Sequence, residues 1–167
     1  DYGILGSKYV LNMLGEYGRT DVIYKMLTRE DYPGYLYWVD HGCTTLAECW
    51  NLGGSHNHYM FSDVSAVFYR YFAGIRPDGD IPAYRSFLLA PALDLAIDML
   101  SCSVESPHGT IFAGWKKDGD TVTFTAGMPF GTTARLRLPA GVQAPENGAV
   151  LGGGRHEFCW KIAQSAG

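Results

Sequence analysis

The chain has 167 residues, of which 18% are charged and 14% aromatic, and it carries a net charge of −4. This length suits one domain or two small ones, and the slightly negative charge argues against a nucleic-acid-binding surface, which needs a basic stripe. No apolar run approaches the roughly 20 residues of a membrane-spanning helix, so we expect no membrane partner.

Apolar residues at helical spacing predict three helices in the first half of the chain. The first covers about residues 5–17, and Gly18 is placed to end it. The second is predicted to begin with Thr20 as its N-cap and to end before the Pro-Gly break at residues 33–34. The third covers about residues 58–73. The predicted buried faces are Val10, Leu14 and Tyr17 in the first helix, Val22, Met26 and Leu27 in the second, and Met60, Val64, Val67, Phe68 and Tyr71 in the third.

Between the second and third helices, residues 32–57 show little periodicity, apart from a short helix expected at residues 44–49. Loops of this length in a compact domain are usually functional. One carboxylate, Glu48, stands two residues before the indole of Trp50, and Gly-Gly-Ser-His-Asn-His follows at residues 53–58. Such residues fill a hydrophobic core poorly and line a polar pocket well. Glu48 is therefore the first candidate for catalysis, and the alternative is that it only caps backbone amides of the loop.

The second half of the chain consists of short apolar runs separated by turn signals, which predicts antiparallel strands in a β-sandwich or jelly roll. The Lys-Asp-Gly-Asp sequence at residues 117–120 predicts a tight hairpin turn. We place the domain boundary between a helical part, residues 1–76, and a β part, residues 77–167. The predicted strand regions are residues 87–90, 93–104, 110–115, 121–125, 134–138 and 156–162.

A zinc site must be weighed, because five potential ligands occur within residues 41–58: His41, Cys43, Cys49, His56 and His58. Their spacing matches no common zinc finger, and alternate residues of an extended segment point apart. The four cysteines of the chain also contain no CxxC pair. We therefore expect free thiols and no metal site.

The helices of this chain are too few to bury one another's apolar faces, so we expect further helices from a larger helical domain. The chain also starts without an initiator Met and without the basic flank and apolar run of a signal peptide. We expect it to be a piece of a longer protein, and the sequence does not indicate its compartment.

Several motifs follow one another in an order that is more specific than any one of them. They are Asp1-Tyr-Gly-Ile-Leu-Gly-Ser-Lys-Tyr-Val10, Glu16-Tyr-Gly-Arg-Thr-Asp21, Tyr32-Pro-Gly-Tyr-Leu-Tyr37, Gly42-Cys-Thr-Thr-Leu-Ala-Glu48, Asn57-His-Tyr-Met-Phe61, Ala73-Gly-Ile75, and Ser106-Pro-His-Gly-Thr-Ile111 with Trp115-Lys116. This series resembles the α-L-rhamnosidases of glycoside hydrolase family 78. The resemblance implies an α+β multidomain fragment, in which the last helices of an (α/α)6-barrel catalytic domain are followed by an antiparallel β-sandwich or jelly-roll domain.

The same resemblance implies an inverting glycosidase that releases terminal α-L-rhamnose from a glycoside or polysaccharide without a cofactor. Inversion needs a carboxylic acid and a carboxylate base, far enough apart to hold a water molecule. Glu48 aligns with the family's general base, in its Thr-Thr-x-Trp-Glu-x-Trp motif. His58 aligns with a histidine that contacts the sugar and Trp50 with an aromatic residue of the pocket, and Asn57 and Tyr35 are expected to complete it.

The sequence also departs from the family pattern. Ala47 stands where the family usually has Trp, and Cys43 and Cys49 also replace the usual residues. The family's general acid lies in an earlier barrel segment. We therefore expect this chain to be inactive by itself and to need the remainder of the barrel as its partner.

A different class of function is a carbohydrate-binding β module without catalysis, with Trp115, Phe124, Phe130 and Trp160 as stacking platforms. On alternating strands such residues more often form the core between sheets. A third interpretation is that the β part only braces the barrel.

Overall fold

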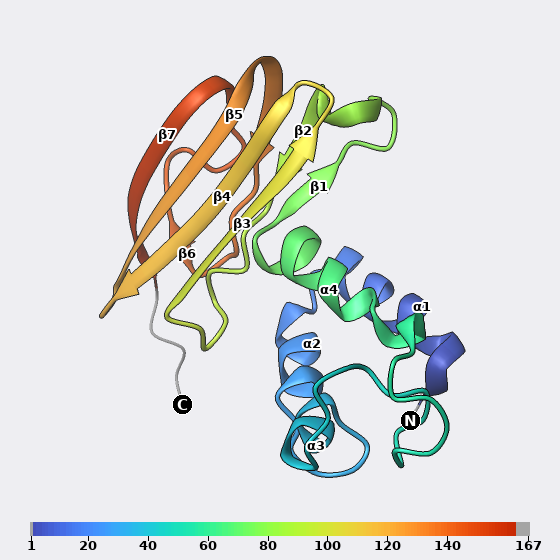
Figure 1. Cartoon of the computed structure of the whole chain (residues 1–167). Helices are drawn as coiled ribbons and strands as arrows, with labels where there is room; N and C mark the ends of the chain where they lie inside the picture. The colour runs from blue at the N-terminus through green and yellow to red at the C-terminus, as the bar shows by residue number, and fades with distance from the viewer. Residues whose placement is uncertain (1, 163–167) are drawn as a thin grey trace. The chain divides into compact units, whose positions relative to one another are not determined.

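The computed structural model describes residues 2–162, which divide between Val67 and Phe68 into a helical unit and a β unit (Figure 1). The expected order, helices first and an antiparallel β domain second, is confirmed. The boundary placed between residues 76 and 77 stays a prediction, and strand β1, Ile75–Pro77, spans it. Among the described residues no helix has the length and apolar character needed to cross a membrane.

The first two predicted helices are confirmed, and the third is divided into short pieces. The helical unit contains α1 (Gly3–Glu16), α2 (Thr20–Leu27), α3 (Tyr35–Asp40), the 3-10 turn η1 (Tyr59–Phe61) and α4 (Asp63–Val67). A π-helical turn, η2 (Phe68–Phe72), then opens the β unit.

Gly18 ends the first helix as expected. Its φ of +71° is left-handed, which glycine adopts without a steric penalty. The Gly18 amide donates to the Gly15 carbonyl and the Arg19 amide to the Leu14 carbonyl, at 3.1 and 2.8 Å, which is the hydrogen-bond pattern of a Schellman motif. The prediction of Thr20 as the next N-cap was wrong, because Arg19 is the capping residue and Thr20 is already helical.

The predicted buried face of α1 was also wrong. Ser7, Leu11 and Gly15 are the buried residues, whereas Tyr17 is 81% exposed. Small residues in this row let the helix approach its neighbours closely, and the larger side chains are directed elsewhere. Hydrophobic size alone therefore selected the wrong face.

The other two predicted faces are confirmed only in part. In α2 the buried residues are Thr20, Ile23 and Leu27, so Leu27 was correct and Val22 and Met26 are only half-buried. In the third helical segment Val67 and Tyr71 are buried, as predicted. Phe68 is exposed, because the chain has passed from α-helix to π-helix at this residue.

The helix expected at residues 44–49 does not form, and the loop instead contains α3 nine residues earlier. This helix begins after the extended Gly34 and buries Tyr35 and Trp38, which lie one turn apart on one face. Two large aromatic anchors thus decide where the short helix forms.

The β unit contains seven strands that are hydrogen-bonded into one sheet. They are β1 (Ile75–Pro77), β2 (Ser86–Leu89), β3 (Met99–Ser106), β4 (Gly109–Asp118), β5 (Thr121–Leu136), β6 (Val142–Gln143) and β7 (Val150–Ile162), with a 3-10 turn η3 (Pro82–Tyr84) between β1 and β2. Only β2 pairs with its neighbour β5 in parallel, and the other described pairs are antiparallel. The predicted hairpin turn is confirmed, since Asp118 pairs with Thr121 across Gly119 and Asp120.

The long strand β5 connects two parts of this sheet. It pairs with β4 over residues 121–127 and, after an irregularity between Met128 and Thr133, with β2 over residues 133–136. Strand β7 accompanies β5 on both sides of that irregularity. Both parts contribute to one hydrophobic core, so a single bent sheet provides the enclosure that two separate sheets would give (Figure 1).

The core contains three of the four aromatic residues that were considered as carbohydrate platforms. Trp115, Phe124 and Trp160 are 3%, 0% and 4% exposed. They alternate inward along their strands, as core residues of a half-buried sheet do. Only Phe130, at 88% exposed, is open to a ligand. The platform interpretation is therefore wrong for the three buried residues.

Candidate active site

Glu48 is held at both its backbone and its side chain by one residue. The Glu48 amide donates to the Ser55 carbonyl at 2.8 Å, and the Ser55 amide donates to Glu48 Oε2 at 3.0 Å. The side chain is half-buried, and among the described residues its second oxygen, Oε1, accepts no hydrogen bond. Glu48 thus does bind a backbone amide, and it also presents a carboxylate oxygen that remains available to a ligand or water.

The backbone near Glu48 passes close to the carboxylate and has positive φ angles at Leu52 and Gly54. Gly54 has a φ of +76°, and a Cβ at this position would lie 2.5 Å from Glu48 Oε2. Leu52, with a φ of +64°, adopts a left-handed conformation that is uncommon for residues with a side chain. Strained backbone of this kind persists where the surrounding contacts over-determine it, often at functional sites.

His58 and Asn57 lie in a segment, residues 55–58, that is hydrogen-bonded to the segment carrying Glu48, residues 46–48. The His58 amide donates to the Leu46 carbonyl at 2.9 Å, and the Asn57 amide donates to Ser55 Oγ at 3.2 Å. Residues 46–48 and 55–58 therefore run beside each other and bring a carboxylate, an amide and an imidazole together.

The imidazole of His58 caps the start of η1. Its Nδ1 accepts from the Met60 amide at 3.4 Å, so this contact assigns the proton to Nε2. The ring also stacks on Tyr59 with a centroid distance of 5.8 Å. The cap and the stacking fix the imidazole while leaving a ring N–H that can donate to a ligand.

Trp50 and Tyr35 belong to a cluster of aromatic side chains in the helical unit, together with Trp38 and Phe61. They are 7% and 9% exposed, and their ring centroids are 5.2 Å apart. Trp38 Nε1 donates to the Trp50 carbonyl at 3.0 Å, and Trp50 packs on Phe61 at 4.4 Å. These contacts anchor the segment that follows Glu48. A direct contact of Trp50 or Tyr35 with sugar stays a prediction.

The Tyr35 hydroxyl is part of the same buried network. It donates to the Phe61 carbonyl at 3.3 Å and lies 3.4 Å from Ser7 Oγ. Burial raises the pKa of the Tyr35 phenol above its ordinary value, so the group stays neutral and serves as a hydrogen-bonding anchor.

The indole of Trp50 also borders a small cavity of about 200 Å³. Its Nε1 is buried and has no hydrogen-bond partner among the described residues. Glu48 does not line this cavity. The other lining residues are Tyr2, Met26, Arg29, Pro33 and Gly34.

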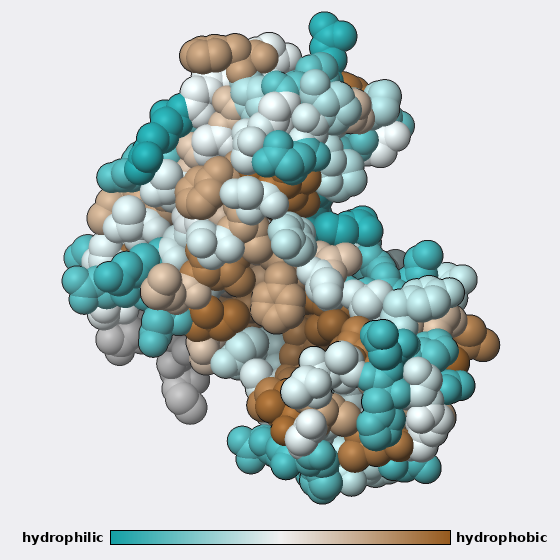
Figure 2. Space-filling view, viewed as in Figure 1, coloured by the Kyte–Doolittle hydropathy of each residue, from teal (hydrophilic) through white to brown (hydrophobic). Residues whose placement is uncertain are grey.

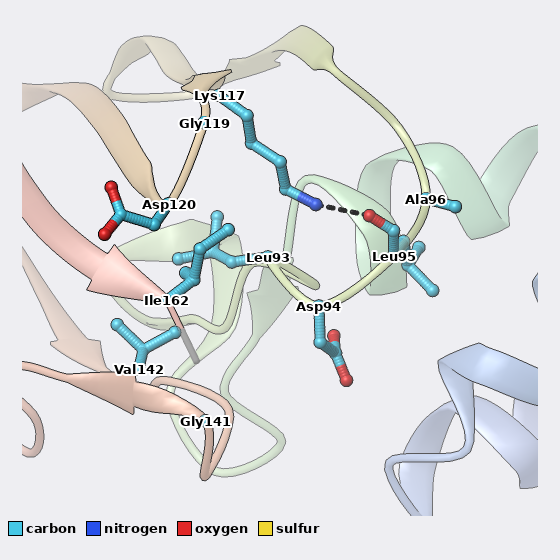
Figure 3. Close-up of a pocket in the computed structure, with 10 residues that line it drawn as sticks. All are labelled: Leu93, Asp94, Leu95, Ala96, Lys117, Gly119, Asp120, Gly141, Val142 and Ile162. Atoms are coloured by element: carbon cyan, nitrogen blue, oxygen red, sulfur yellow. Dashed lines mark hydrogen bonds between the residues drawn. The ribbon is translucent and has the colours of Figure 1, made fainter. Parts of the chain in front are cut away.

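A larger pocket of about 390 Å³ lies in the β unit (Figure 3). The Lys117 ammonium donates to the Leu95 carbonyl at one side of it, and burial lowers the Lys117 pKa. Asp94 and Asp120 also line the pocket, but Figure 3 shows their carboxylates directed away from each other. The lining contains no aromatic side chain on which a sugar ring could stack, so we do not place the active site there.

The potential metal ligands of the loop do not form a coordination site. Within residues 2–162 no group of three or more His, Cys, Asp or Glu side chains is placed to hold a metal ion. The imidazoles of His41 and His56 instead contact carbonyls one turn back, those of Tyr37 and Leu52.

Sequence reasoning missed Ser55, the residue that holds Glu48. A serine after two glycines indicates a turn, but nothing in its spacing identifies the partner seven positions earlier. The sequence signal is the Gly53-Gly54 pair before Ser55, because glycine readily adopts the positive φ that Gly54 has next to Glu48 and Ser55.

Two family models match the chain. Residues 1–72 match the bacterial alpha-L-rhamnosidase 6 hairpin glycosidase domain, and residues 74–150 match the bacterial alpha-L-rhamnosidase C-terminal domain. The two matches meet where the helices give way to the sheet.

Curated relatives carry the same name over most of this chain. An alpha-L-rhamnosidase of Formosa agariphila is 32% identical over 81% of the chain and 15% of the relative. One from Alteromonas sp. is 30% identical over 83% of the chain and 16% of the relative. One from Streptomyces avermitilis is 29% identical over 93% of the chain and 17% of the relative. The chain thus spans about a sixth of the length of these relatives.

Solved structures show the same similarity in three dimensions. The Streptomyces avermitilis alpha-L-rhamnosidase complexed with L-rhamnose superposes with a TM-score of 0.82 and 28% identity, over 94% of this chain and 18% of that one. The alpha-L-rhamnosidase of Dictyoglumus thermophilum gives a TM-score of 0.81 and 25% identity, over 95% of this chain and 21% of that one. The alpha-L-rhamnosidase of Aspergillus terreus gives a TM-score of 0.83 and 25% identity, over 94% of this chain and 19% of that one.

Proposed function

Because this chain belongs to the bacterial α-L-rhamnosidase family through both of its domains, we propose that it carries the catalytic base of an inverting α-L-rhamnosidase. It comprises the end of a helical six-hairpin glycosidase domain and the C-terminal β domain that follows. The observation that carries the proposal is the geometry of Glu48: the Ser55 amide fixes Oε2, while Oε1 accepts no hydrogen bond from the described residues 2–162.

In this proposal Glu48 activates a water molecule. The water gives a proton to the Glu48 carboxylate as its oxygen bonds to the anomeric carbon, on the face opposite the glycosidic oxygen. The bond from the anomeric carbon to the glycosidic oxygen breaks, and that oxygen takes a proton from a carboxylic acid on another part of the barrel. The configuration at the anomeric carbon is thereby inverted.

The neighbouring residues hold the sugar and the loop in this proposal. His58, through its Nε2–H, and Asn57, through its exposed amide, bind sugar hydroxyls beside the carboxylate. Trp50 presents an indole edge to the sugar, and Tyr35 fixes the Trp50 ring from below. Ala47 is fully buried. Because Ala is smaller than the Trp that the family usually has at this position, it changes the packing behind Glu48.

The substrate that we propose is a terminal α-L-rhamnoside of a glycoside or polysaccharide, and no cofactor takes part. The support is the family and a structural neighbour whose title names bound L-rhamnose.

Since one carboxylate cannot serve both halves of the reaction, we propose that the isolated chain is inactive and that the remaining barrel is its partner. In this proposal the β unit is structural, because Trp115, Phe124 and Trp160, three of its four candidate carbohydrate platforms, are buried in its core.

The stereochemistry of the product tests the mechanism. The protein for this test is a chimaera, in which this chain replaces the matched region of the Streptomyces avermitilis enzyme. Proton NMR of the first-formed sugar should show β-L-rhamnose, with the α anomer appearing only at the rate of mutarotation. If α-L-rhamnose forms first, the enzyme retains configuration and Glu48 is not a base acting on water.

A further inference from the structure

Strand β4 places one large aromatic side chain on the outer face of the sheet, away from the core. The inward residues of this strand, Ile111, Ala113 and Trp115, are buried. Phe112 alternates with them, so it lies on the opposite face, where it is half-buried and outside the hydrophobic core cluster. A single apolar residue at a surface needs no explanation by itself, so the surroundings of this ring decide its meaning.

Two glycines leave the sheet open around the Phe112 ring. Gly114 follows Phe112 on the same face of β4, and Gly127 is the partner of Phe112 on β5. A Cβ at Gly114 would lie 3.0 Å from Phe112 Cζ, so the ring leans along the strand over Gly114. Neither glycine has a positive φ, so backbone conformation does not require them. Glycine inside a strand weakens it and often marks a place where a ligand comes close to the backbone.

Phe112 lines a groove of about 450 Å³ on the outer faces of β3, β4 and β5, which we call the Phe112 groove. The register of the strands places two rows of lining residues side by side across the sheet: Ser101, Gly114 and Thr125, and then Met99, Lys116 and Thr123. Most of these side chains are exposed or half-buried, so the groove is open to solvent. Its volume falls within the range of about 300–1,000 Å³ that is typical of small-molecule sites.

The polar groups of the Phe112 groove suit the hydroxyl groups of a sugar. Ser101, Thr123 and Thr125 each provide a hydroxyl, which can donate and accept a hydrogen bond as a sugar hydroxyl does. Among residues 2–162 these three hydroxyls have no hydrogen-bond partner. Lys116 and Asp118 add one charge of each sign, so the lining favours a neutral ligand over an anion or a cation.

The lining also distinguishes a sugar from a protein partner. The core of a protein interface is a contiguous apolar patch, whereas the Phe112 groove combines one aromatic ring with hydroxyls and charges. Figure 2 shows the same mixture on the visible face of the β unit, where apolar side chains lie among polar ones. A pyranose has C–H groups on its faces and hydroxyls at its edge. The C–H groups are slightly positive and pack on the negative face of an aromatic ring.

We propose that the Phe112 groove binds a neutral pyranose of a glycan, at a site separate from Glu48. The Phe112 ring contacts the C–H groups of the sugar, and the hydroxyls of Ser101, Thr123 and Thr125 bond to its hydroxyls. The β unit then has a binding role on its outer face besides the structural role of its core. Only the choice of rhamnose as a probe rests on the proposed function.

Amide chemical shifts of the isotope-labelled isolated chain test the proposal. The probes are two neutral sugars, methyl α-L-rhamnopyranoside and methyl β-D-glucopyranoside. Each is titrated to about 100 mM, well above the expected Kd on the order of 1–10 mM for one sugar ring in an open groove. At least one sugar should cause saturable shifts at Gly114, Lys116, Thr123 and Thr125. Shifts at residues 46–58 report separately on the candidate active site.

Variants then assign the binding to individual side chains. Phe112→Ala should weaken binding at least about tenfold, because the ring provides the main contact. The matched control is Phe130→Ala, at another aromatic residue of the β unit, which is 88% exposed and lies outside the groove. It should leave the Kd unchanged. Thr123→Val/Thr125→Val keeps the side-chain shape and the strand preference, and it should weaken binding about 3- to 10-fold through the lost hydrogen bonds.

Three results would overturn the proposal. The first is that neither sugar shifts the amides of the Phe112 groove. The second is that Phe112→Ala, or the double Thr variant if Phe112→Ala does not fold, binds as tightly as the unchanged chain. The third is a chain that sediments as a dimer and whose groove amides shift with protein concentration, because the occupant is then a second copy. Binding is measured here without hydrolysis, so an inactive chimaera bears only on the assignment of Glu48.

Discussion

The Glu48 carboxylate is held asymmetrically, and the proposed chemistry of this single residue depends on that asymmetry. One carboxylate oxygen is fixed by the Ser55 amide, and the backbone of Gly54 passes so close that it has no room for a side chain. The other oxygen is left open within the described residues. This asymmetry is what a base acting on a water molecule requires, because the group must be oriented without being saturated.

The change Glu48→Gln in the chimaera removes the base and keeps the shape of the side chain. We expect kcat to fall about 10²–10⁴-fold, the usual contribution of general base catalysis. The affinity for L-rhamnose, measured by calorimetry, should change by no more than about threefold, since binding groups remain in place. The matched control is Glu30→Gln, at an exposed carboxylate of the same unit. Retention of more than a few per cent of the rate by Glu48→Gln would remove Glu48 from the mechanism.

The change Gly54→Ala should displace the carboxylate without removing it. The new Cβ would lie 2.5 Å from Oε2, so Glu48 has to move. We expect kcat to fall between about 10- and 100-fold, as small displacements of a catalytic group do. Gly42→Ala is the control, because Gly42 has a similar φ of +81° and open space where a Cβ would be. Equal losses in the two variants would mean that backbone strain, rather than the contact with Glu48, is responsible.

The sequence predicts a catalytic role for Glu48, but it does not predict the contacts that hold this residue. Two signals single out Glu48: the polar, glycine-rich loop in which it stands, and the motif Gly42-Cys-Thr-Thr-Leu-Ala-Glu48 within an ordered series. The contact with Ser55 follows from the path of an irregular loop, and no periodicity encodes such a path. Trp50 and Tyr35 were predicted as pocket residues from the family resemblance, whereas their burial depends on packing with Trp38 and Phe61.

At the scale of elements, sequence patterns located the helices and strands better than the faces that they bury. The faces of α1 and α2 were assigned to the largest apolar residues, but Ser7, Gly15 and Thr20 occupy the buried positions. When a helix carries apolar residues on two faces, helical spacing alone identifies two candidate buried faces and does not choose between them. In the β unit the alternation was clearer, and the Asp118–Thr121 hairpin was found from its turn residues.

The aromatic cluster of the helical unit offers a test of what holds the loop after Glu48. Trp38→Phe removes the N–H that bonds the Trp50 carbonyl, whereas Trp50→Phe removes an N–H without a partner among the described residues. Both changes remove a similar volume from the same cluster. We expect Trp38→Phe to lower the free energy of unfolding by about 1–3 kcal/mol more than Trp50→Phe, because it leaves a buried carbonyl unsatisfied.

The measurement is urea unfolding of the isolated chain, followed by helical circular dichroism. Equal free energies of unfolding for the two variants would show that packing alone, and not the indole hydrogen bond, holds this part of the loop.

At the scale of the whole molecule, the chain combines the end of a six-hairpin glycosidase domain with a C-terminal β domain. Both were expected from the ordered motifs, and the family matches and the superpositions agree. What the sequence did not reveal is that β5 pairs with β4 and then with β2, so that one sheet builds both sides of the core. Such a switch depends on the irregularity after Met128, which carries no distinct pattern.

We propose that this chain supplies one of two catalytic carboxyl groups and that the other lies in the remaining barrel. The decisive measurement is the hydrolysis of p-nitrophenyl α-L-rhamnoside by the isolated chain and by the chimaera at equal concentrations. We predict that the chimaera releases p-nitrophenol and that the isolated chain does not. Activity of the isolated chain would rule out this division, because the acid would then lie within these 167 residues. A folded chimaera without activity would equally contradict the assignment of Glu48.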